Sequence, residues 1–333
     1  LCLAALMLTG CTSAKTEEAA QQETDGKEEN GEKKIQIGLT VDSFVIERWI
    51  RDRDVFVATA RDLGAEVNVQ DAGADAQEQI SQIDYFIKKH MDVIVIIARD
   101  CGALSEAVER AHSSGIRVIS YDRMVNDANT DMYISFDNRM VGEIMAQSME
   151  EAIPDGGKIF MIQGSATDNN VAMVKEGFED TLQGSNLQVV YEANCEGWTA
   201  ELAVDYVEEA LEEYPDVKGI FATNETAADL VVNVLDSMDK TTGEDRIKVV
   251  SFDGGEDQMK LLEDGKIDGL IVQNPYGIGY ATVVACARAV LGQGNEATVS
   301  TGYTWVTKDN MNKDSIKKML YSVSYTHLTL PTI

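Results

Sequence analysis

The sequence predicts an α/β protein with two Rossmann-like lobes, each a parallel sheet flanked by helices. Short apolar, β-branched runs alternate with helical patterns along most of the 333 residues, as is typical of parallel strands in βα units. Ten such runs are more than one sheet of ordinary size holds, and the length allows roughly two domains. Because no Pro/Ser-rich linker separates two halves, we expect the lobes to be joined by short crossings.

The individual elements follow from the same alternation. The strands are expected, in chain order, at residues 35–40, 66–69, 93–98, 117–121, 132–136, 158–162, 188–191, 218–222, 248–251 and 270–272. Helices are expected at 45–63, 76–90, 103–114 and from about 138 to 152, with further helices beginning near residues 170, 199, 225, 256 and 275. Pro275 suits the first turn of the last of these helices.

The net charge of −29 belongs to the folded part of the chain. Residues 12–34 hold seven acidic and four basic residues and contribute only −3, so −26 remains for the rest. This acidity argues against a nucleic-acid partner, which requires clustered Lys and Arg, and against binding of anionic lipid by the folded body. A neutral polyol or a cation remains compatible, and the acidity can also serve solubility alone.

The N-terminus resembles the end of a lipoprotein signal. Residues 1–8 form an apolar stretch too short to span a bilayer, and Leu8-Thr9-Gly10-Cys11 is similar to the bacterial lipobox. We therefore predict a signal truncated at its start over residues 1–11, with lipidation of Cys11, and a disordered polar tether over 12–33. The protein is then extracytoplasmic, and only its lipid anchors it to the outer face of the bacterial cell membrane.

Residues 322–333 do not fit the α/β pattern. They show neither helical periodicity nor a partner strand, so we interpret them as a foreign tail from sequencing or cloning. An extra edge strand is the alternative.

Signatures of catalysis and of metal or cofactor binding are missing. The chain contains no GxGxxG after its first strand, no GxxxxGK[ST] and no GxSxG. Its histidines are His90, His112 and His327, and outside the signal Cys101, Cys195 and Cys286 form no CxxC. We expect no enzyme activity, no metal and no cofactor.

Polar side chains follow six of the predicted strands at their carboxyl ends, where open α/β sheets bind ligands. They are Asp42, Asp122-Arg123, Asp168-Asn169-Asn170, Asn224, Asp253 and Gln273-Asn274. Asp, Asn and Arg are suitable partners for sugar hydroxyls, and an aromatic ring such as that of Trp198 packs well on the C–H face of a pyranose. We expect a polar ligand that is gripped rather than transformed.

Several of these residues also have a purely structural interpretation. Asp168 and Asn224 could be N-caps, and residues 253–256 (Asp-Gly-Gly-Glu) could form a capping box. Arg48 could form an ordinary surface ion pair, and Trp49 could belong to the core. Convergence of so many polar residues on one side of two sheets favours a binding site.

Four segments resemble a known family in the same order: Ile46-Glu47-Arg48-Trp49, residues 120–124 (Ser-Tyr-Asp-Arg-Met), residues 133–138 (Tyr-Ile-Ser-Phe-Asp-Asn) and Asp168-Asn169-Asn170. They are similar to the periplasmic xylose-binding proteins of ABC transporters, over about residues 34–293. The resemblance implies a type I periplasmic binding protein fold with three hinge crossings. It places the N-terminal lobe at 34–135 plus 275–302 and the C-terminal lobe at 136–274 plus 303–321.

The resemblance also implies which residues contact sugar. The implied contacts are Arg48, Arg123, Asp168, Asn170, Trp198, Asn224 and Asp253, and Glu47 and Trp49 are further candidates beside Arg48. Where the xylose-type pattern carries a Lys, this chain has Gln273-Asn274, as in ribose- and galactose-type members. Xylose is therefore our first expectation, closely followed by another aldopentose or aldohexose.

The expected function is that of a monomeric substrate-binding lipoprotein that closes on a monosaccharide and delivers it to an ABC permease. A sugar sensor that presents its closed form to a receptor kinase is an alternative. A sugar-responsive repressor would need a helix-turn-helix, and an extracellular sugar-modifying enzyme would need a suitably spaced acid/base carboxylate pair.

Overall fold

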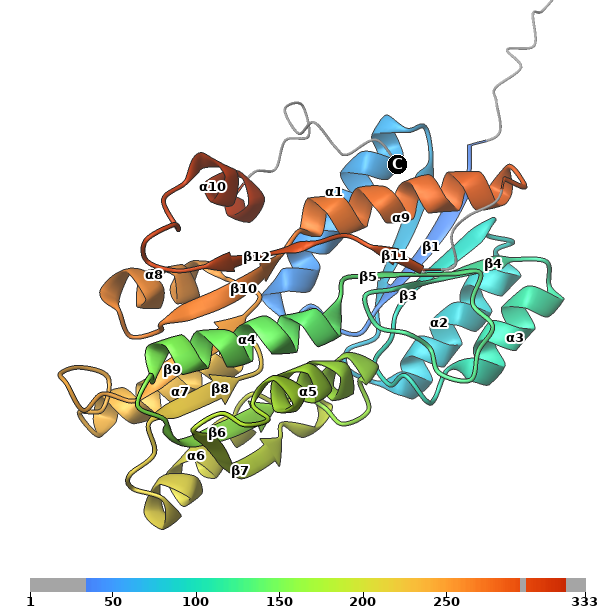
Figure 1. Cartoon of the computed structure of the whole chain (residues 1–333). Coiled ribbons are helices and arrows are strands. Elements are labelled where there is room, and N and C mark those ends of the chain that lie inside the picture. The colour runs from blue at the N-terminus through green and yellow to red at the C-terminus, as the bar shows by residue number, and fades with distance from the viewer. Residues whose placement is uncertain (1–33, 294–297, 322–333) are drawn as a thin grey trace, which may run out of the picture. The chain divides into compact units, whose positions relative to one another are not determined.

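Two six-stranded sheets dominate the computed structural model, which describes residues 34–293 and 298–321 (Figure 1). The first sheet has the strand order β11-β5-β4-β3-β1-β2 and is parallel throughout. The second has the order β12-β10-β9-β8-β6-β7 and is parallel except for β12, which runs antiparallel to β10. The predicted fold class is confirmed.

All ten predicted strands are present with small shifts at their ends. The first sheet contains β1 (Gln36–Val41), β2 (Glu66–Asp71), β3 (Val93–Ile97), β4 (Arg117–Tyr121), β5 (Met132–Ser135) and β11 (Thr298–Ser300). The second contains β6 (Gly157–Gln163), β7 (Leu187–Asn194), β8 (Gly219–Ala222), β9 (Lys248–Phe252), β10 (Gly269–Gln273) and β12 (Tyr303–Val306).

Helices cover both faces of each sheet. They are α1 (Glu47–Asp62), α2 (Ala76–Lys88), α3 (Ser105–Ser113), α4 (Asn138–Ala152), α5 (Asn169–Thr181), α6 (Leu202–Glu213), α7 (Glu225–Ser237), α8 (Glu256–Asp264), α9 (Pro275–Val290) and α10 (Asp314–Tyr321). The helix expected near residue 199 begins at Leu202, because Glu196–Trp198 first form a short 3-10 turn, η1.

Alternation along the buried strands determines which helices cover which face. In β3, Val93, Val95 and Ile97 pack in the core beneath α1 and α9, whereas Ile94 and Ile96 pack in the core beneath α2 and α3. Successive side chains of a strand point to opposite faces, so a strand buried on both faces reads as a continuous apolar run. The second sheet lies in the same way between α4 and α5 on one face and α6 and α7 on the other.

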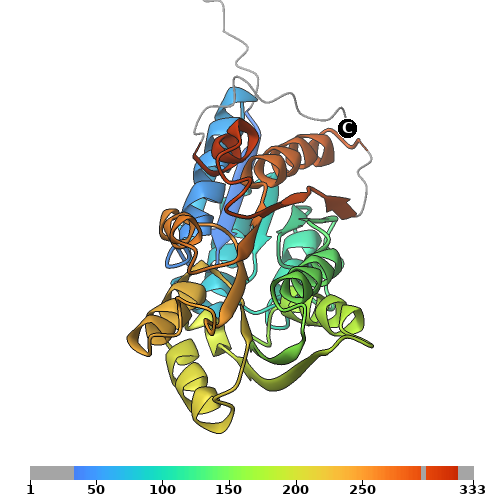
Figure 2. The same cartoon turned by 60° about the vertical axis from the view of Figure 1, so that its left-hand side comes forward.

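The chain crosses between the sheets three times. It passes from β5 into α4, from β10 into α9, and from β11 into β12. Figures 1 and 2 show these crossings running side by side between the sheets. The last crossing contains Gly302 at φ 82°, a backbone conformation that glycine adopts without strain. Three short crossings are the predicted hinge arrangement.

The predicted signal with Cys11, the predicted tether and residues 322–333 lie outside the described residues. Within the described ranges, no helix combines the length and apolar character needed to cross a membrane. Over those same ranges, no group of three or more His, Cys, Asp or Glu side chains is arranged to hold a metal ion.

Candidate ligand-binding cavity

A cavity lies between the two sheets, at the carboxyl ends of their strands. Its walls come from the start of α1 and the segment after β4 on one side, and from α4, α5, η1 and the ends of β6, β8, β9 and β10 on the other. The space between its walls is about 610 Å³, counting the part that opens to solvent.

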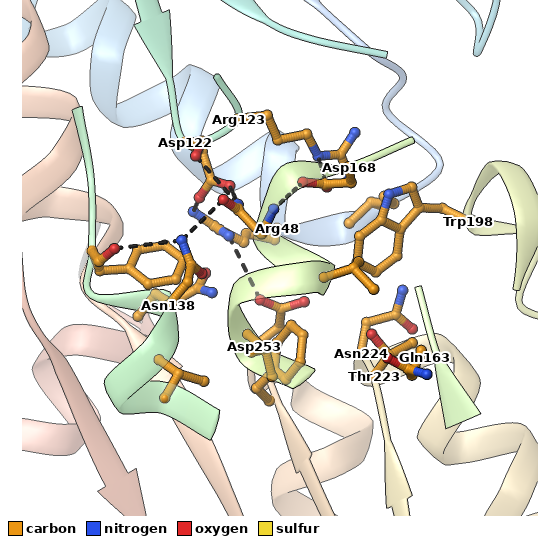
Figure 3. Close-up of a pocket in the computed structure, with 18 of the residues that line it drawn as sticks. Arg48, Asp122, Arg123, Asn138, Gln163, Asp168, Trp198, Thr223, Asn224 and Asp253 are labelled. Carbon is orange, nitrogen blue, oxygen red and sulfur yellow. Dashed lines mark hydrogen bonds and ion pairs between the residues drawn. The ribbon is translucent and has the colours of Figure 1, made fainter. Parts of the chain in front are cut away.

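Arg48 lies at the centre of the cavity and pairs with carboxylates from both sheets (Figure 3). Its Nε lies 3.3 Å from Oδ2 of Asp52, one turn further along α1. A second guanidinium nitrogen pairs with Asp122 after β4, and Nη1 lies 3.7 Å from Oδ1 of Asp253 after β9. The guanidinium also lies over the ring of Trp49, 4.5 Å from its centroid. These contacts hold a buried cation in one orientation.

Arg123 forms a second bridge between the sheets. Its Nη1 lies 2.7 Å from Oδ2 of Asp42 and donates to the carbonyl oxygen of Ala98 at 3.0 Å. Its Nε lies 2.6 Å from Oδ2 of Asp168, which belongs to the other lobe. The guanidinium carbon lies 5.0 Å from the ring centroid of Trp198. Arg123 is 2% exposed, so its charge depends on these two carboxylates.

Asp122 receives donors from both lobes as well. Its carboxylate Oδ1 accepts a hydrogen bond from Asn170 Nδ2 at 2.8 Å, and its carbonyl oxygen accepts from the hydroxyls of Tyr133 and Ser135 at 2.9 Å each. Asn170 Oδ1 in turn accepts from Asn138 Nδ2 at 2.9 Å. Asn138 begins α4 directly after the first crossing, so this network links the hinge to the cavity.

Two tryptophans, Trp49 and Trp198, line the cavity. The indole Nε1 atoms of Trp49 and Trp198 are buried, and neither has a hydrogen-bond partner among the described residues. The ring of Trp198 lies directly over Gly164, where an added Cβ would come within 2.4 Å of the ring. The absence of a side chain at Gly164 therefore leaves room for the indole of Trp198.

Two acceptors without a hydrogen bond among the described residues lie on the C-terminal side of the cavity. Oδ1 of Asp253 and Oε1 of Gln273 are buried and have no hydrogen-bond partner within the described part of the chain. Asn224 lies at the end of β8, where its Oδ1 accepts from Ala227 N at 2.9 Å. Buried donors and acceptors normally have partners, so this set can bind a ligand that both donates and accepts.

Three residues of the cavity have positive φ angles although they are not glycine. The values are 63° for Asp122, 58° for Trp198 and 88° for Asp253. Such conformations cost on the order of 1–3 kcal/mol each and gather at functional sites. They place these three side chains in the cavity at a cost to stability.

Carboxylates outnumber guanidinium groups in and beside the cavity, and several of these carboxylates have raised pKa values. Burial raises the pKa of Asp253 to about 6, against the lowering effect of Arg48 and with a further increase from Asp122. Burial likewise raises the pKa of Asp52 and of Asp168, opposed by Arg48 and Arg123 respectively. For Arg48, burial lowers the pKa, but the surrounding carboxylates outweigh it and hold the pKa above its ordinary value. Added hydrogen-bond donors would stabilise the ionised carboxylates.

Comparison with known proteins identifies the family. Residues 37–294 match the periplasmic binding protein domain. The D-xylose-binding periplasmic protein of Escherichia coli (strain K12) is 32% identical over 94% of this chain and 94% of its own length. The chain belongs to the periplasmic binding proteins. The resemblance seen in the sequence is confirmed.

Solved structures agree with the fold. A carbohydrate transporter solute binding protein from Agrobacterium radiobacter, in complex with D-arabinose, has a TM-score of 0.80 and 25% identity, covering 87% of this chain and 99% of its own. An ABC transporter solute binding protein from Burkholderia graminis C4D1M, also in complex with D-arabinose, has a TM-score of 0.78 and 26% identity, covering 84% and 96%. Periplasmic binding proteins bind solutes and are not enzymes, as the missing catalytic signatures indicated.

In this periplasmic binding protein, nine of the eleven predicted site residues line the cavity. They are Arg48, Trp49, Arg123, Asp168, Asn170, Trp198, Asn224, Asp253 and Gln273. Asn274 does not line it: its Oδ1 accepts from Gly277 N at 3.0 Å and caps α9. The side chain of Glu47 lies outside the described part of the structure.

The structural interpretations of these residues have mixed outcomes. Asp168 and Asn224 are N-caps of α5 and α7 and line the cavity at the same time. The capping box expected at residue 253 is wrong, because Gly255 is the N-cap of α8 and Asp253 faces Arg48. A surface ion pair for Arg48 is also wrong, since Arg48 is buried. Trp49 is part of the core and also lines the cavity.

Other lining residues were not predicted as site residues. They are Ile46, Asp122, Phe136, Asn138, Val141, Gln163, Val171, Val174, Phe221, Thr223 and Phe252. Asp122 was named among the strand-end polar residues but not among the implied sugar contacts. Gln163 and Thr223 also end or follow strands, so the strand-end rule could have selected them. The apolar residues carry no such signal, because a Val or Phe beside a cavity looks like any core residue.

Proposed function

We propose that this chain is the extracytoplasmic sugar-binding lipoprotein of an ABC importer, with a monosaccharide bound in the cavity. The supporting observation is a set of buried groups on cavity-lining residues that have no hydrogen bond among the described residues: two indole N–H donors, a carboxylate oxygen and an amide oxygen. A polyol both donates and accepts, and its C–H face packs on tryptophan. The D-xylose-binding relative and the two D-arabinose complexes point to the same ligand class.

D-Xylose is the first candidate, and a related aldopentose or aldohexose is the next. Sequence identity to the D-xylose-binding protein supports it. The pair Gln273-Asn274 weakens the assignment, because amides stand where the xylose-type pattern carries an ammonium. An amide has a different set of donors and acceptors from an ammonium, so this position should decide which sugar is preferred.

Binding is proposed to close two lobes, one of residues 34–135 plus 275–302 and the other of 136–274 plus 303–321. Arg48 and Arg123 lie in the first, and Trp198, Asn224 and Asp253 in the second. A sugar contacts both sets only when the lobes are closed, so it favours the closed form by its differential affinity. A monomer in that form would deliver the sugar to the membrane permease, and lipid on Cys11 would keep it at the outer face of the membrane.

Intrinsic tryptophan fluorescence tests the proposal. Addition of D-xylose, D-arabinose, D-ribose or D-glucose should change the emission of the wild type, because Trp49 and Trp198 both line the cavity. Asp253→Ala and Arg123→Ala should lose the response, whereas Asp245→Ala, at an exposed position, should keep it. No change with any sugar, together with no heat in calorimetry, would overturn the proposal. Sustained conversion of the sugar would indicate an enzyme instead.

A further inference from the structure

Three consecutive residues at the start of α5 each contact one of three consecutive residues after β4. Asn170 donates to Asp122 at 2.8 Å, and Asp168 lies 2.6 Å from Nε of Arg123. Between them, Oδ1 of Asn169 accepts a hydrogen bond from the backbone N–H of Met124 at 3.0 Å. Figure 3 shows Asp168 and Arg123 meeting at the edge of the cavity. The two segments belong to different lobes.

Asn169 differs from its neighbours because it does not line the cavity. Its Oδ1 also accepts from Sγ of Cys101, at 3.4 Å, in the segment after β3. The backbone N–H of Cys101 donates to the carbonyl oxygen of Thr167 at 3.2 Å. Two segments of the first lobe are thus tied to the start of α5 by contacts in which no ligand takes part.

We infer that these contacts form an interlobe clasp, which stabilises the closed lobes without sugar, and that Asn169 sets sugar affinity without touching the sugar. The clasp consists of Cys101, Asp122, Arg123 and Met124 on one side and residues 167–170 on the other. The inference rests on the proposed closure. A ligand that binds the closed form has an apparent Kd equal to its intrinsic Kd divided by the closed fraction, so a contact that only raises that fraction strengthens binding.

The size of the effect follows from the bond to Met124. Loss of one hydrogen bond of ordinary strength lowers the ratio of closed to open protein about fivefold. If the open form predominates, the change appears mainly in Kd; if the closed form predominates, it appears mainly in the open fraction. In either case, the product of the apparent Kd and the sugar-free open fraction rises about fivefold. This is because the product equals the intrinsic Kd divided by the ratio of closed to open protein.

Single-molecule FRET and calorimetry measure the two quantities. Dyes are placed at Asn129→Cys and Asp245→Cys, which are exposed positions in different lobes, in the full chain with Cys2 and Cys11 changed to Ser. Asn169→Ala should raise the product of Kd and open fraction about fivefold and leave the order of sugar preference unchanged. Asn312→Ala, an exposed Asn away from the clasp, should leave the product unchanged. An unaltered product in folded Asn169→Ala overturns the inference.

Measurements on protein that keeps Asn169 leave the inference testable if Asn169→Ala does not fold. The sugar-free protein should show a closed population by FRET, and Cys101 should react slowly with N-ethylmaleimide. Burial raises the pKa of the Cys101 thiol to about 12 in the closed form, so only opened molecules react readily. Labelling is read by peptide mass spectrometry, with Cys286 in the core of the first lobe as internal reference. No closed population, together with rapid labelling of Cys101, contradicts the clasp. The FRET arm needs no sugar, so a failure of the proposed function would be recognised separately.

Discussion

Replacing Asp253 by Asn should remove a pH dependence from sugar binding. Burial raises the pKa of Asp253 to about 6, and its Oδ1 has no hydrogen-bond partner among the described residues. An ionised carboxylate accepts strong hydrogen bonds from sugar hydroxyls, whereas the protonated acid gives up part of its acceptor capacity. The sugar should therefore bind the ionised form in preference and release a proton when it binds at lower pH.

The magnitude follows from this pKa. With a pKa of about 6, roughly nine-tenths of the Asp253 side chains are protonated at pH 5 and about one-tenth at pH 7. If only the ionised form binds, Kd at pH 5 is roughly tenfold higher than at pH 7. In Asp253→Asn, affinity should be lower at pH 7 and nearly the same at both pH values.

The same group gives a prediction for stability without sugar. The pKa of Asp253 in the folded protein is raised above the ordinary value of an aspartate. Ionisation of Asp253 therefore destabilises the folded state most above pH 6, and this destabilisation decreases as the pH is lowered towards 4. The unfolding free energy of the wild type, minus that of Asp253→Asn, should therefore rise between pH 7 and pH 5. Taking this difference cancels the contribution of Asp168, whose pKa is raised in the same direction.

Calorimetric titration with the best-bound sugar at several pH values, and urea unfolding at the same values, measure both effects. Asp245→Asn, an exposed position, serves as the control. A wild-type Kd that stays constant from pH 7 to pH 5, or an equal pH dependence in Asp253→Asn, would show that ionisation of Asp253 does not control sugar binding.

Three further substitutions separate the parts of the site. Gly164→Ala would place a Cβ 2.4 Å from the Trp198 ring. By moving the indole, it should weaken sugar binding about tenfold in calorimetry, which corresponds to about 1.4 kcal/mol. Unchanged affinity would show that the ring does not contact the sugar. Arg123→Ala leaves Asp168 buried without its partner, so urea unfolding should show that the free energy of unfolding falls by about 3–5 kcal/mol. A decrease below about 1 kcal/mol, as is typical of exposed ion pairs, would contradict this expectation. Asn274→Ala removes only the N-cap of α9, so it should lower the free energy of unfolding by about 1 kcal/mol and leave the Kd for sugar unchanged. A large rise in that Kd would place Asn274 in the binding site.

Local signals predicted most of the fold. Strands such as Val93–Ile97 are buried on both faces. Their alternate side chains pack in the apolar cores on the two sides of the sheet, so every residue of the strand is apolar. The short edge strand Thr298–Ser300 was not predicted from the residues, because its Thr and Ser are exposed and carry no apolar pattern. The start of α6 was misplaced because η1, with Gly197 at φ 60°, interrupts the helix signal.

The strand-end rule selected most of the polar residues of the cavity but could not show their partners. Arg48 and Asp253 are 205 positions apart in the chain, and their contact depends on how the two lobes meet. The capping-box interpretation of residues 253–256 failed for the same reason, since local spacing gave no information about Arg48. The role of Asn274 as the cap of α9 could be expected, because it directly precedes a helix-starting proline.

Calorimetric titration of the wild-type chain with a panel of pentoses and hexoses tests whether the cavity binds a monosaccharide. We expect at least one monosaccharide, with D-xylose first, to bind at one molecule per chain, and we expect Arg48→Ala and Asp253→Ala to abolish its heat of binding. Absence of heat with every sugar, or sugar binding that survives both substitutions, would contradict this expectation.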